Sequence, residues 1–184
     1  MQQEVLQTTR LVLRPFRLDD AATVERLAGA REIADTTLNI PHPYPQGAAS
    51  AWIGQHEAMR EAGTDLIYAI IRRETTELIG SVALSIAAEH ARAEIGYWIS
   101  AAHWNQGYCT EAGRVVVCLA FDSLGLHRVQ GRHLVRNAAS GRVMTKLGMQ
   151  LEGIHRDAIR KWDRFEDIAH HAILATDSDA AYRM

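Results

Sequence analysis

The stretch AEIGYWISAAHWNQGYCTEA, residues 93–112, changes structural character at the second of its two glycines, Gly107. Its first residues are β-rich and typical of a strand, whereas the residues after Gly107 begin an apolar helix that we expect at 108–124. Because glycine has no Cβ, the backbone can turn tightly at Gly107 and a ligand can approach it closely. The stretch therefore predicts a strand, a glycine turn and a helix in direct succession.

The start of this helix is suited to binding an anion. Its first N–H groups have no partner within the helix, and the helix dipole places a partial positive charge there. Main-chain amides of the turn can therefore hold a phosphate without a lysine. An ordinary strand-to-helix turn, with Thr110 as a local cap, is equally consistent with this loop alone. The sequence contains neither GxxxxGK[ST] nor a GxGxxG after a strand, which argues against a P-loop or Rossmann nucleotide site.

Composition limits the classes of function. The chain has 184 residues, 47% of them hydrophobic, so we expect one domain over 1–184 with a substantial core. A formal net charge of −2 provides no broad basic surface for nucleic acid or an anionic membrane. No apolar run approaches the roughly 18 residues of a membrane span, and the first residues do not resemble a signal peptide. With two cysteines and no ligand spacing, we expect no disulfide framework, no metal site and a cytoplasmic protein.

Hydrophobic periodicity and turn residues predict four helices and seven strands. The helices are expected at residues 21–30, 48–61, 108–124 and 139–146, and the strands at 8–17, 65–73, 77–87, 91–100, 127–135, 150–156 and 166–175. Short turns join the second, third and fourth strands, which favours antiparallel pairing. The later strand–helix–strand order favours parallel pairing. The prediction is a mixed α/β sheet, antiparallel early and parallel in the middle.

Three motifs together resemble one family. The opening stretch, RNAASGRVMTKLGMQLEG at 136–153 and TTRLVLRPFRLDD at 8–20 are similar to the GNAT acetyltransferases, in particular to the RimJ/RimL branch of ribosomal-protein alanine N-acetyltransferases. The resemblance implies the α/β (α+β) GNAT fold, with a mixed sheet of six to seven strands flanked by about four helices. The sheet would be splayed between its fourth and fifth strands. It also implies a bulge in the fourth strand, near residues 93–100.

The resemblance further implies an N-acetyltransferase that depends on acetyl-CoA. Pantetheine would lie in the gap between the splayed strands and contact the backbone at Trp98, Ile99 and Ser100. The diphosphate would rest on amides of the loop, at Gln106, Gly107, Tyr108, Cys109 and Thr110. Asn137 resembles the family asparagine that contacts the pantetheine arm. The branch often has a second glycine at the position of Asn105, so the path of the turn is left open.

The chemistry needs a base for the amine, a polarised thioester carbonyl and a proton for the leaving sulfur. Glu94 occupies the position where some members keep a glutamate base, acting directly or through water. Its alternative role is to pair with a basic neighbour or to order water. A backbone N–H near Trp98 or Ile99 would polarise the carbonyl. Ser140 would protonate the sulfur, with Asn137 as a third catalytic candidate, and helix capping is the alternative role for both.

The acceptor is less constrained than the cofactor. The segment TTLNIPHPYPQG, residues 36–47, lies where this family builds one wall of the acceptor pocket. His42 and Tyr44, together with Glu94, are therefore the candidate acceptor contacts. The branch implies a protein or peptide N-terminal amine. A small amine (an antibiotic, polyamine or metabolite), a non-catalytic acetyl-CoA-binding module and a homodimer are left open.

Cys109 offers a different mechanism. A thiolate in the first turn of a helix is stabilised, and His103 is close in sequence, so an acyl-cysteine enzyme is conceivable. The surrounding motif resembles a family that transfers the acetyl group directly, and Cys109 stands where that family has a small residue. We therefore expect Cys109 to be dispensable for activity.

Overall fold

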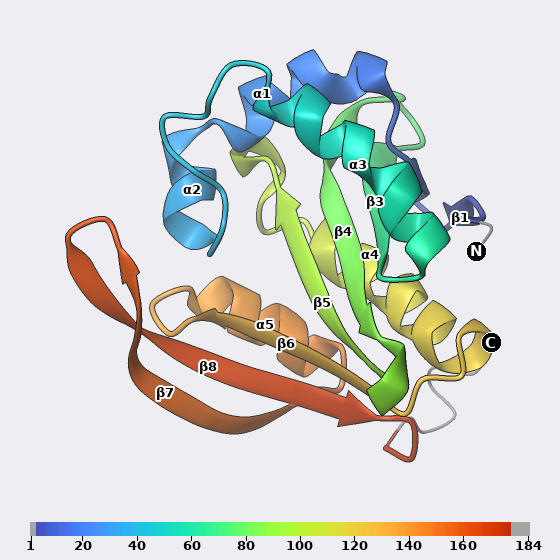
Figure 1. Ribbon diagram of the computed structural model, residues 1–184, viewed down its shortest axis with the longest axis vertical. Helices are drawn as coiled ribbons and strands as arrows, with labels where there is room; N and C mark the ends of the chain where they lie inside the picture. Colours follow the sequence, from blue (N-terminus) through green and yellow to red (C-terminus); the bar gives the residue numbers. More distant parts are fainter. Residues whose placement is uncertain (1–2, 178–184) are drawn as a thin grey trace.

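Eight strands and five α-helices form over residues 3–177, the part of the chain that the computed structural model describes (Figure 1). The strands are β1 (Leu6–Gln7), β2 (Leu11–Pro15), β3 (Asp65–Arg72), β4 (Leu78–Ala87), β5 (Arg92–Ile99), β6 (Arg128–Leu134), β7 (Gln150–Lys161) and β8 (Arg164–Leu174). The helices are α1 (Ala21–Ala28), α2 (Arg31–Thr36), α3 (Ala48–Ala62), α4 (Tyr108–Cys118) and α5 (Ala138–Lys146). A π-helical turn, Leu119–Ser123, extends α4.

The strands form one sheet in the order β1-β2-β3-β4-β5-β6-β8-β7. Neighbours from β1 to β5 are antiparallel, β5 and β6 are parallel, and β6, β8 and β7 are again antiparallel. The crossover from β5 to β6 runs through α4, as expected for a parallel pair. The predicted pairing, antiparallel early and parallel in the middle, is confirmed.

Two short elements go beyond the six to seven strands and about four helices expected from the sequence. The two-residue strand β1 exists through its pairing with β2, where Leu6 lies opposite Leu13. The six-residue helix α2 has no side-chain cap and buries Ile33 and Ala34. Isolated helices of this length are unstable in water, so tertiary contacts rather than local sequence stabilise α2.

The sheet splits between β5 and β6. The two strands pair only from Arg92, opposite Arg128, to Glu94, opposite Gln130, and then diverge toward α2 (Figure 1). This confirms the expected splay. The expected bulge in the same strand is wrong, because the register of β5 against β4 runs unbroken. Register shifts lie instead between β3 and β4, at Ile70/Ile71, and between β7 and β8, at Leu151/Gly153 and His155/Ile159.

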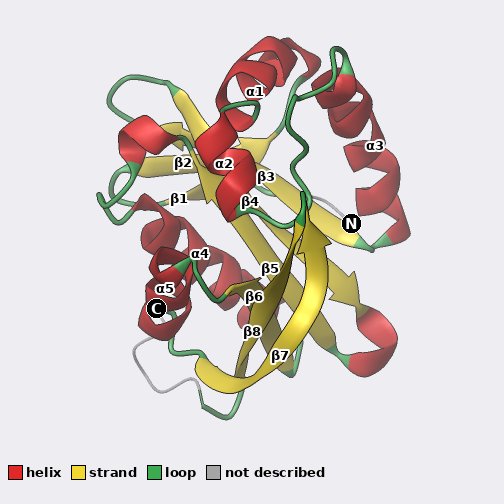
Figure 2. Ribbon diagram, turned by 90° about the vertical axis from the view of Figure 1, so that its left-hand side faces the viewer, coloured by secondary structure: helices red, strands yellow, loops and turns green. Residues whose placement is uncertain are grey.

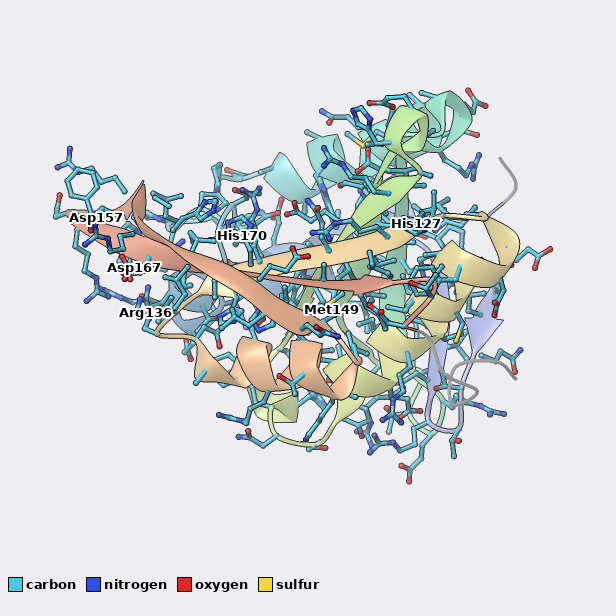
Figure 3. All side chains as sticks on the ribbon, turned by 90° about the horizontal axis from the view of Figure 1, so that it is seen from below. His127, Arg136, Met149, Asp157, Asp167 and His170 are labelled. Atoms are coloured by element: carbon cyan, nitrogen blue, oxygen red, sulfur yellow. The ribbon has the colours of Figure 1, made fainter. Side chains whose placement is uncertain are left out.

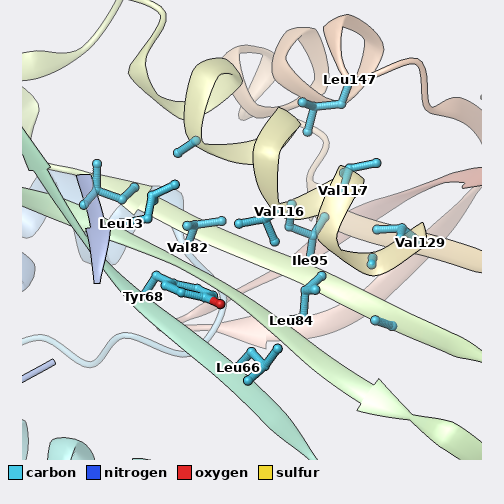
Figure 4. Packing of buried hydrophobic residues seen from close by; sticks show 14 of the residues in the cluster. Leu13, Leu66, Tyr68, Val82, Leu84, Ile95, Val116, Val117, Val129 and Leu147 are labelled. Carbon is cyan, nitrogen blue, oxygen red and sulfur yellow. The ribbon is translucent and has the colours of Figure 1, made fainter. Parts of the chain in front are cut away.

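Helices α4 and α5 cover one face of the sheet, and α1 and α3 cover the other (Figure 2). Val116 and Val117 of α4 are fully buried in one cluster with Leu84 and Ile95 of the sheet (Figure 4). Burying an aliphatic side chain of this size contributes about 1.5–3 kcal/mol. This packing fixes α4 along its length, so its first residue, Tyr108, stays beside the end of β5.

Candidate active site

The loop between β5 and α4 turns through two left-handed residues, Asn105 (φ +59°) and Gly107 (φ +82°). Gly107 is the N-cap of α4, and among the described residues no side-chain hydrogen bond caps this end. The alternative in which Thr110 is a local cap is therefore not observed. The N–H groups of Tyr108, Cys109 and Thr110 belong to the first turn and have no acceptor within the helix. Residues 104–107 are exposed, Tyr108 is buried, and Cys109 and Thr110 are partly buried.

Main-chain groups of β5 point alternately toward its two neighbours. The Ser100 N–H donates to the Ile79 carbonyl at 2.8 Å, toward β4. Because hydrogen bonds alternate along an antiparallel pair, Trp98 also faces β4, whereas Tyr97 and Ile99 face the side that β6 has left. The N–H groups of Tyr97 and Ile99 therefore open into the gap. Of the three predicted backbone contacts to pantetheine, Ile99 directs its N–H there, and Trp98 and Ser100 do not.

Ser140 and Tyr97 meet on the face that α5 covers. Tyr97 Oη lies 2.9 Å from Ser140 Oγ and donates to the Ser140 carbonyl at 3.1 Å. Burial raises the pKa of the Tyr97 hydroxyl, which therefore stays protonated. Tyr97 is missing from the sequence-based candidates, although the alternation of side chains along β5 could have placed it opposite Glu94. Ser140 is thus held by a protonated partner at the edge of the gap.

Asn137 acts as a cap at the start of α5. Its Oδ1 accepts from the Ser140 N–H at 3.2 Å, and its Nδ2 donates to the Thr36 carbonyl of α2 at 2.9 Å. The capping alternative is therefore observed for Asn137, and its contact with pantetheine stays a prediction. The same side chain links α5 to α2 across the open end of the gap.

Arg136, labelled in Figure 3, joins α2 to strand β8. Its guanidinium donates to both oxygens of the Asp35 carboxylate, at 2.9 and 3.0 Å, and to Glu166 at 2.9 Å. Beside this network, between α2 and the β7–β8 turn, lies an open pocket of about 430 Å³. The pocket is lined by Arg31, Glu32, Asp35, Trp162 and Arg164.

Glu94 lies on the other face of β5 from Ser140, because residues 94 and 97 are separated by an odd number of positions. Its carboxylate accepts from Arg132 Nε at 2.8 Å and from Gln130 Nε2 at 3.5 Å. Pairing with a basic neighbour, the alternative raised from the sequence, is therefore present, and the base role stays a prediction. His170 lies near this carboxylate and is absent from the sequence-based candidates (Figure 3). Its pKa is lowered, first by burial and then by the neighbouring His155 and Arg132.

Cys109 lacks the properties of a nucleophile. Although part of the residue is exposed, desolvation around the thiol raises the pKa of Cys109 to about 12. A reactive cysteine needs a lowered pKa, since the thiolate is the nucleophile. The expectation of a thiolate stabilised at this helix start, which underlies the acyl-cysteine alternative, is therefore wrong. His103, its proposed helper, instead bonds Ser100 Oγ at 2.8 Å.

His42 and Tyr44 lie in the segment that joins α2 to α3, next to a hydrophobic cluster formed by α1 and α3. His42 Nδ1 is 3.1 Å from the Gly29 carbonyl, and the side chain is exposed. Tyr44 packs with Trp52 and Trp98 against α1 and α3. Burial raises the pKa of Tyr44, which therefore remains a neutral phenol. Their contacts with an acceptor stay predictions.

The described part of the chain, residues 3–177, contains no cluster of three or more His, Cys, Asp or Glu side chains placed to hold a metal ion. None of its helices is long and apolar enough to cross a membrane.

The uncapped helix start and the split parallel pair are the arrangement that the resemblance to the GNAT acetyltransferases implies. The family model described as "Acetyltransferase (GNAT) domain" matches residues 10–150 of this chain. The chain therefore belongs to the GNAT acetyltransferase family and is an N-acetyltransferase.

One relative and two solved structures are similar to this chain. The uncharacterized N-acetyltransferase YoaA of Bacillus subtilis (strain 168) is 33% identical over 153 residues, covering 83% of this chain and 86% of YoaA. The fold is similar to that of RimL, described as a ribosomal L7/L12 alpha-N-protein acetyltransferase in complex with coenzyme A (TM-score 0.87, 18% identity, 95% and 100% coverage). It is also similar to MccE, a microcin C7 self-immunity acetyltransferase in complex with acetyl-CoA and AMP (TM-score 0.81, 19% identity, 91% and 93% coverage).

Proposed function

We propose that the protein transfers the acetyl group of acetyl-CoA to a primary amine by direct attack, in a ternary complex. The observation that carries this proposal is the end of the β5–β6 ladder at Glu94, on the strand that leads into the uncapped start of α4. The N–H groups of Tyr97 and Ile99 can pair with the amides of pantetheine as they would with a strand. The amides of residues 106–110 fit a diphosphate at a helix start.

Residues on both faces of β5 contribute to the reaction. Acetyl-CoA supplies the activated acyl group. When the Ile99 N–H pairs with pantetheine, the Tyr97 N–H, which lies farther from the loop, stabilises negative charge on the thioester oxygen. Glu94 takes a proton from the attacking amine, directly or through water, as the N–C bond forms. Ser140, oriented by Tyr97, gives its hydroxyl proton to the sulfur as the C–S bond breaks, and it regains a proton from solvent.

We propose a protein or peptide N-terminal amine as the acceptor. The open pocket between α2 and the β7–β8 turn, which solvent can reach, is the proposed place for the acceptor. The resemblance to the RimJ/RimL branch and the similarity to RimL support the choice of an N-terminal amine. The similarity to MccE favours a small amine as the second candidate. His42 and Tyr44 are proposed to line the approach to the pocket.

The test is a thiol-release assay with purified protein, acetyl-CoA and two panels of acceptors, N-terminal peptides and small amines. We expect one free thiol for each acetyl group found on the acceptor by mass spectrometry, with Ser140→Ala as the low-activity control. Peptide acetylation alone supports the proposed acceptor, and small-amine acetylation alone replaces it with the second candidate. Binding of CoA without turnover on either panel would reduce the chain to a non-catalytic binding module.

A homodimer, left open by the sequence, belongs to the same set of proposals. Light scattering of the purified protein measures it directly, because a dimer doubles the 20.5 kDa mass of the chain.

A further inference from the structure

Arg10 lies directly against the loop at the start of α4. Its Nη1 donates to the Gln106 carbonyl at 3.0 Å, and its guanidinium carbon stands 4.5 Å from the centre of the Tyr108 ring. Its Nε and Nη2 bind Glu111 at 2.7 and 2.6 Å. One side chain, from the residue before β2, thus contacts the loop, the first residue of α4 and a carboxylate in the first turn of that helix.

Glu111 would otherwise place a negative charge beside this loop. Burial alone would raise its pKa, but hydrogen bonds from Thr8 and from the main chain and side chain of Arg10 lower the pKa of Glu111 overall. The carboxylate is therefore ionised near neutral pH. A carboxylate in the first turn suits the helix dipole, but it repels a second anion bound at the same helix start.

The Arg10–Glu111 pair contributes little to folding. The Arg10 side chain is 46% exposed and that of Glu111 is 18% exposed, so solvent screens the pair from the Arg10 side, and ion pairs at the surface contribute about 0–1 kcal/mol. The effect of Arg10 on the binding of an anion is larger than its effect on stability, because Arg10 changes the net charge next to the loop from −1 to 0 and holds Gln106 in place. The geometry therefore assigns Arg10 a role in ligand binding rather than in stability.

We propose that Arg10 is a positioning residue for the diphosphate of CoA: it fixes the Gln106–Gly107 turn and neutralises Glu111, so that the free amides of α4 can accept the anion. This inference rests on the proposed function, because it presumes that CoA binds at this loop. It concerns the diphosphate only, so a ligand without phosphate should be indifferent to Arg10.

The test compares two ligands and four proteins. CoA affinity is measured by calorimetry, and binding of pantetheine, which lacks the diphosphate, is measured by NMR titration. The proteins are the wild type, Arg10→Ala, Arg10→Ala with Glu111→Gln, and Arg73→Ala. Arg73 is the matched control, because it donates to the Thr8 carbonyl at 2.9 Å on the same hairpin and bonds neither the loop nor Glu111. Thermal unfolding verifies that each variant is folded.

Arg10→Ala should weaken CoA about tenfold, because it exposes the Glu111 charge to the diphosphate, and should leave pantetheine unchanged. Adding Glu111→Gln should restore CoA affinity to within about threefold of the wild type, and Arg73→Ala should match the wild type. The inference is overturned if Arg10→Ala binds CoA within twofold of the wild type, if pantetheine weakens by the same factor, or if the double variant does not recover. A wild type that binds no CoA defeats the proposed function instead.

Discussion

Replacing Gly107 with alanine isolates the contribution of the loop to CoA binding. Gly107 has φ +82°, and a Cβ built there meets only Arg10 Nη2, at an ordinary 3.5 Å. The substitution therefore adds backbone strain without a clash, and a left-handed alanine costs about 1–2 kcal/mol. If the free loop relaxes and must be restored to bind the diphosphate, the Kd for CoA rises about 5- to 30-fold.

Calorimetry with CoA measures the Kd, and denaturant unfolding measures the stability of the same variant. Gly125→Ala is the matched control, because Gly125 is also left-handed (φ +61°), has open space around it and lies beyond the other end of α4. It should lose about 1–2 kcal/mol of stability and bind CoA as the wild type does. A folded Gly107→Ala protein with unchanged CoA affinity would refute the placement of the diphosphate at this loop.

Three further predictions concern substitutions of single residues. Cys109→Ala should keep kcat within about twofold in the thiol-release assay, because a thiol with a raised pKa is a poor nucleophile; complete loss would revive the acyl-cysteine mechanism. Gly54→Ala should raise the unfolding free energy by about 0.4–1 kcal/mol, since Gly54 lies within α3 with open space around its Cα; a loss of stability would contradict the helical geometry there. The folded-state pKa of Glu111 is lowered, so its contribution to stability is present above its unfolded pKa and is lost as pH falls through the folded value. Glu111→Gln should therefore flatten that part of the acid-unfolding profile relative to the wild type, and an unchanged profile would contradict this.

The parts of the fold that the sequence predicts are those with local signals. The strands of the central sheet carry β-rich runs between short turns, and their pairing follows from turn length. The helix predicted at 108–124 covers the extension of α4, but no local signal indicates that its last turn is π-helical, and none indicates the short helix α2. In α2 a helix forms because Thr36 and Asp35 meet residues about 100 positions away, which no local pattern records.

The same distinction separates the predicted from the unpredicted site residues. The glycine loop is a contiguous motif, so Gly107 and the first turn of α4 could be identified from the sequence. The partners of its neighbours could not, because Arg10 reaches Glu111 across 101 positions, and Arg132 reaches Glu94 across 38. Which carboxylate is paired, and with what, depends on how the strands align. Sequence patterns therefore indicated the candidate loop, whereas the register of the sheet determines how the charged residues around it are paired.

The split sheet also separates the two proton transfers of the proposed reaction. Glu94 and Ser140 face opposite sides of β5, and the strand between them is continuous with β4. In the proposed reaction, β5 therefore lies between the group that takes a proton and the group that gives one, and pantetheine would fill the gap beside the strand. The proposed base and the proposed acid would each exchange protons with solvent on their own face. The amine would then meet Glu94 on one face of β5 and the sulfur would meet Ser140 on the other, so donor and acceptor would not compete for one entrance.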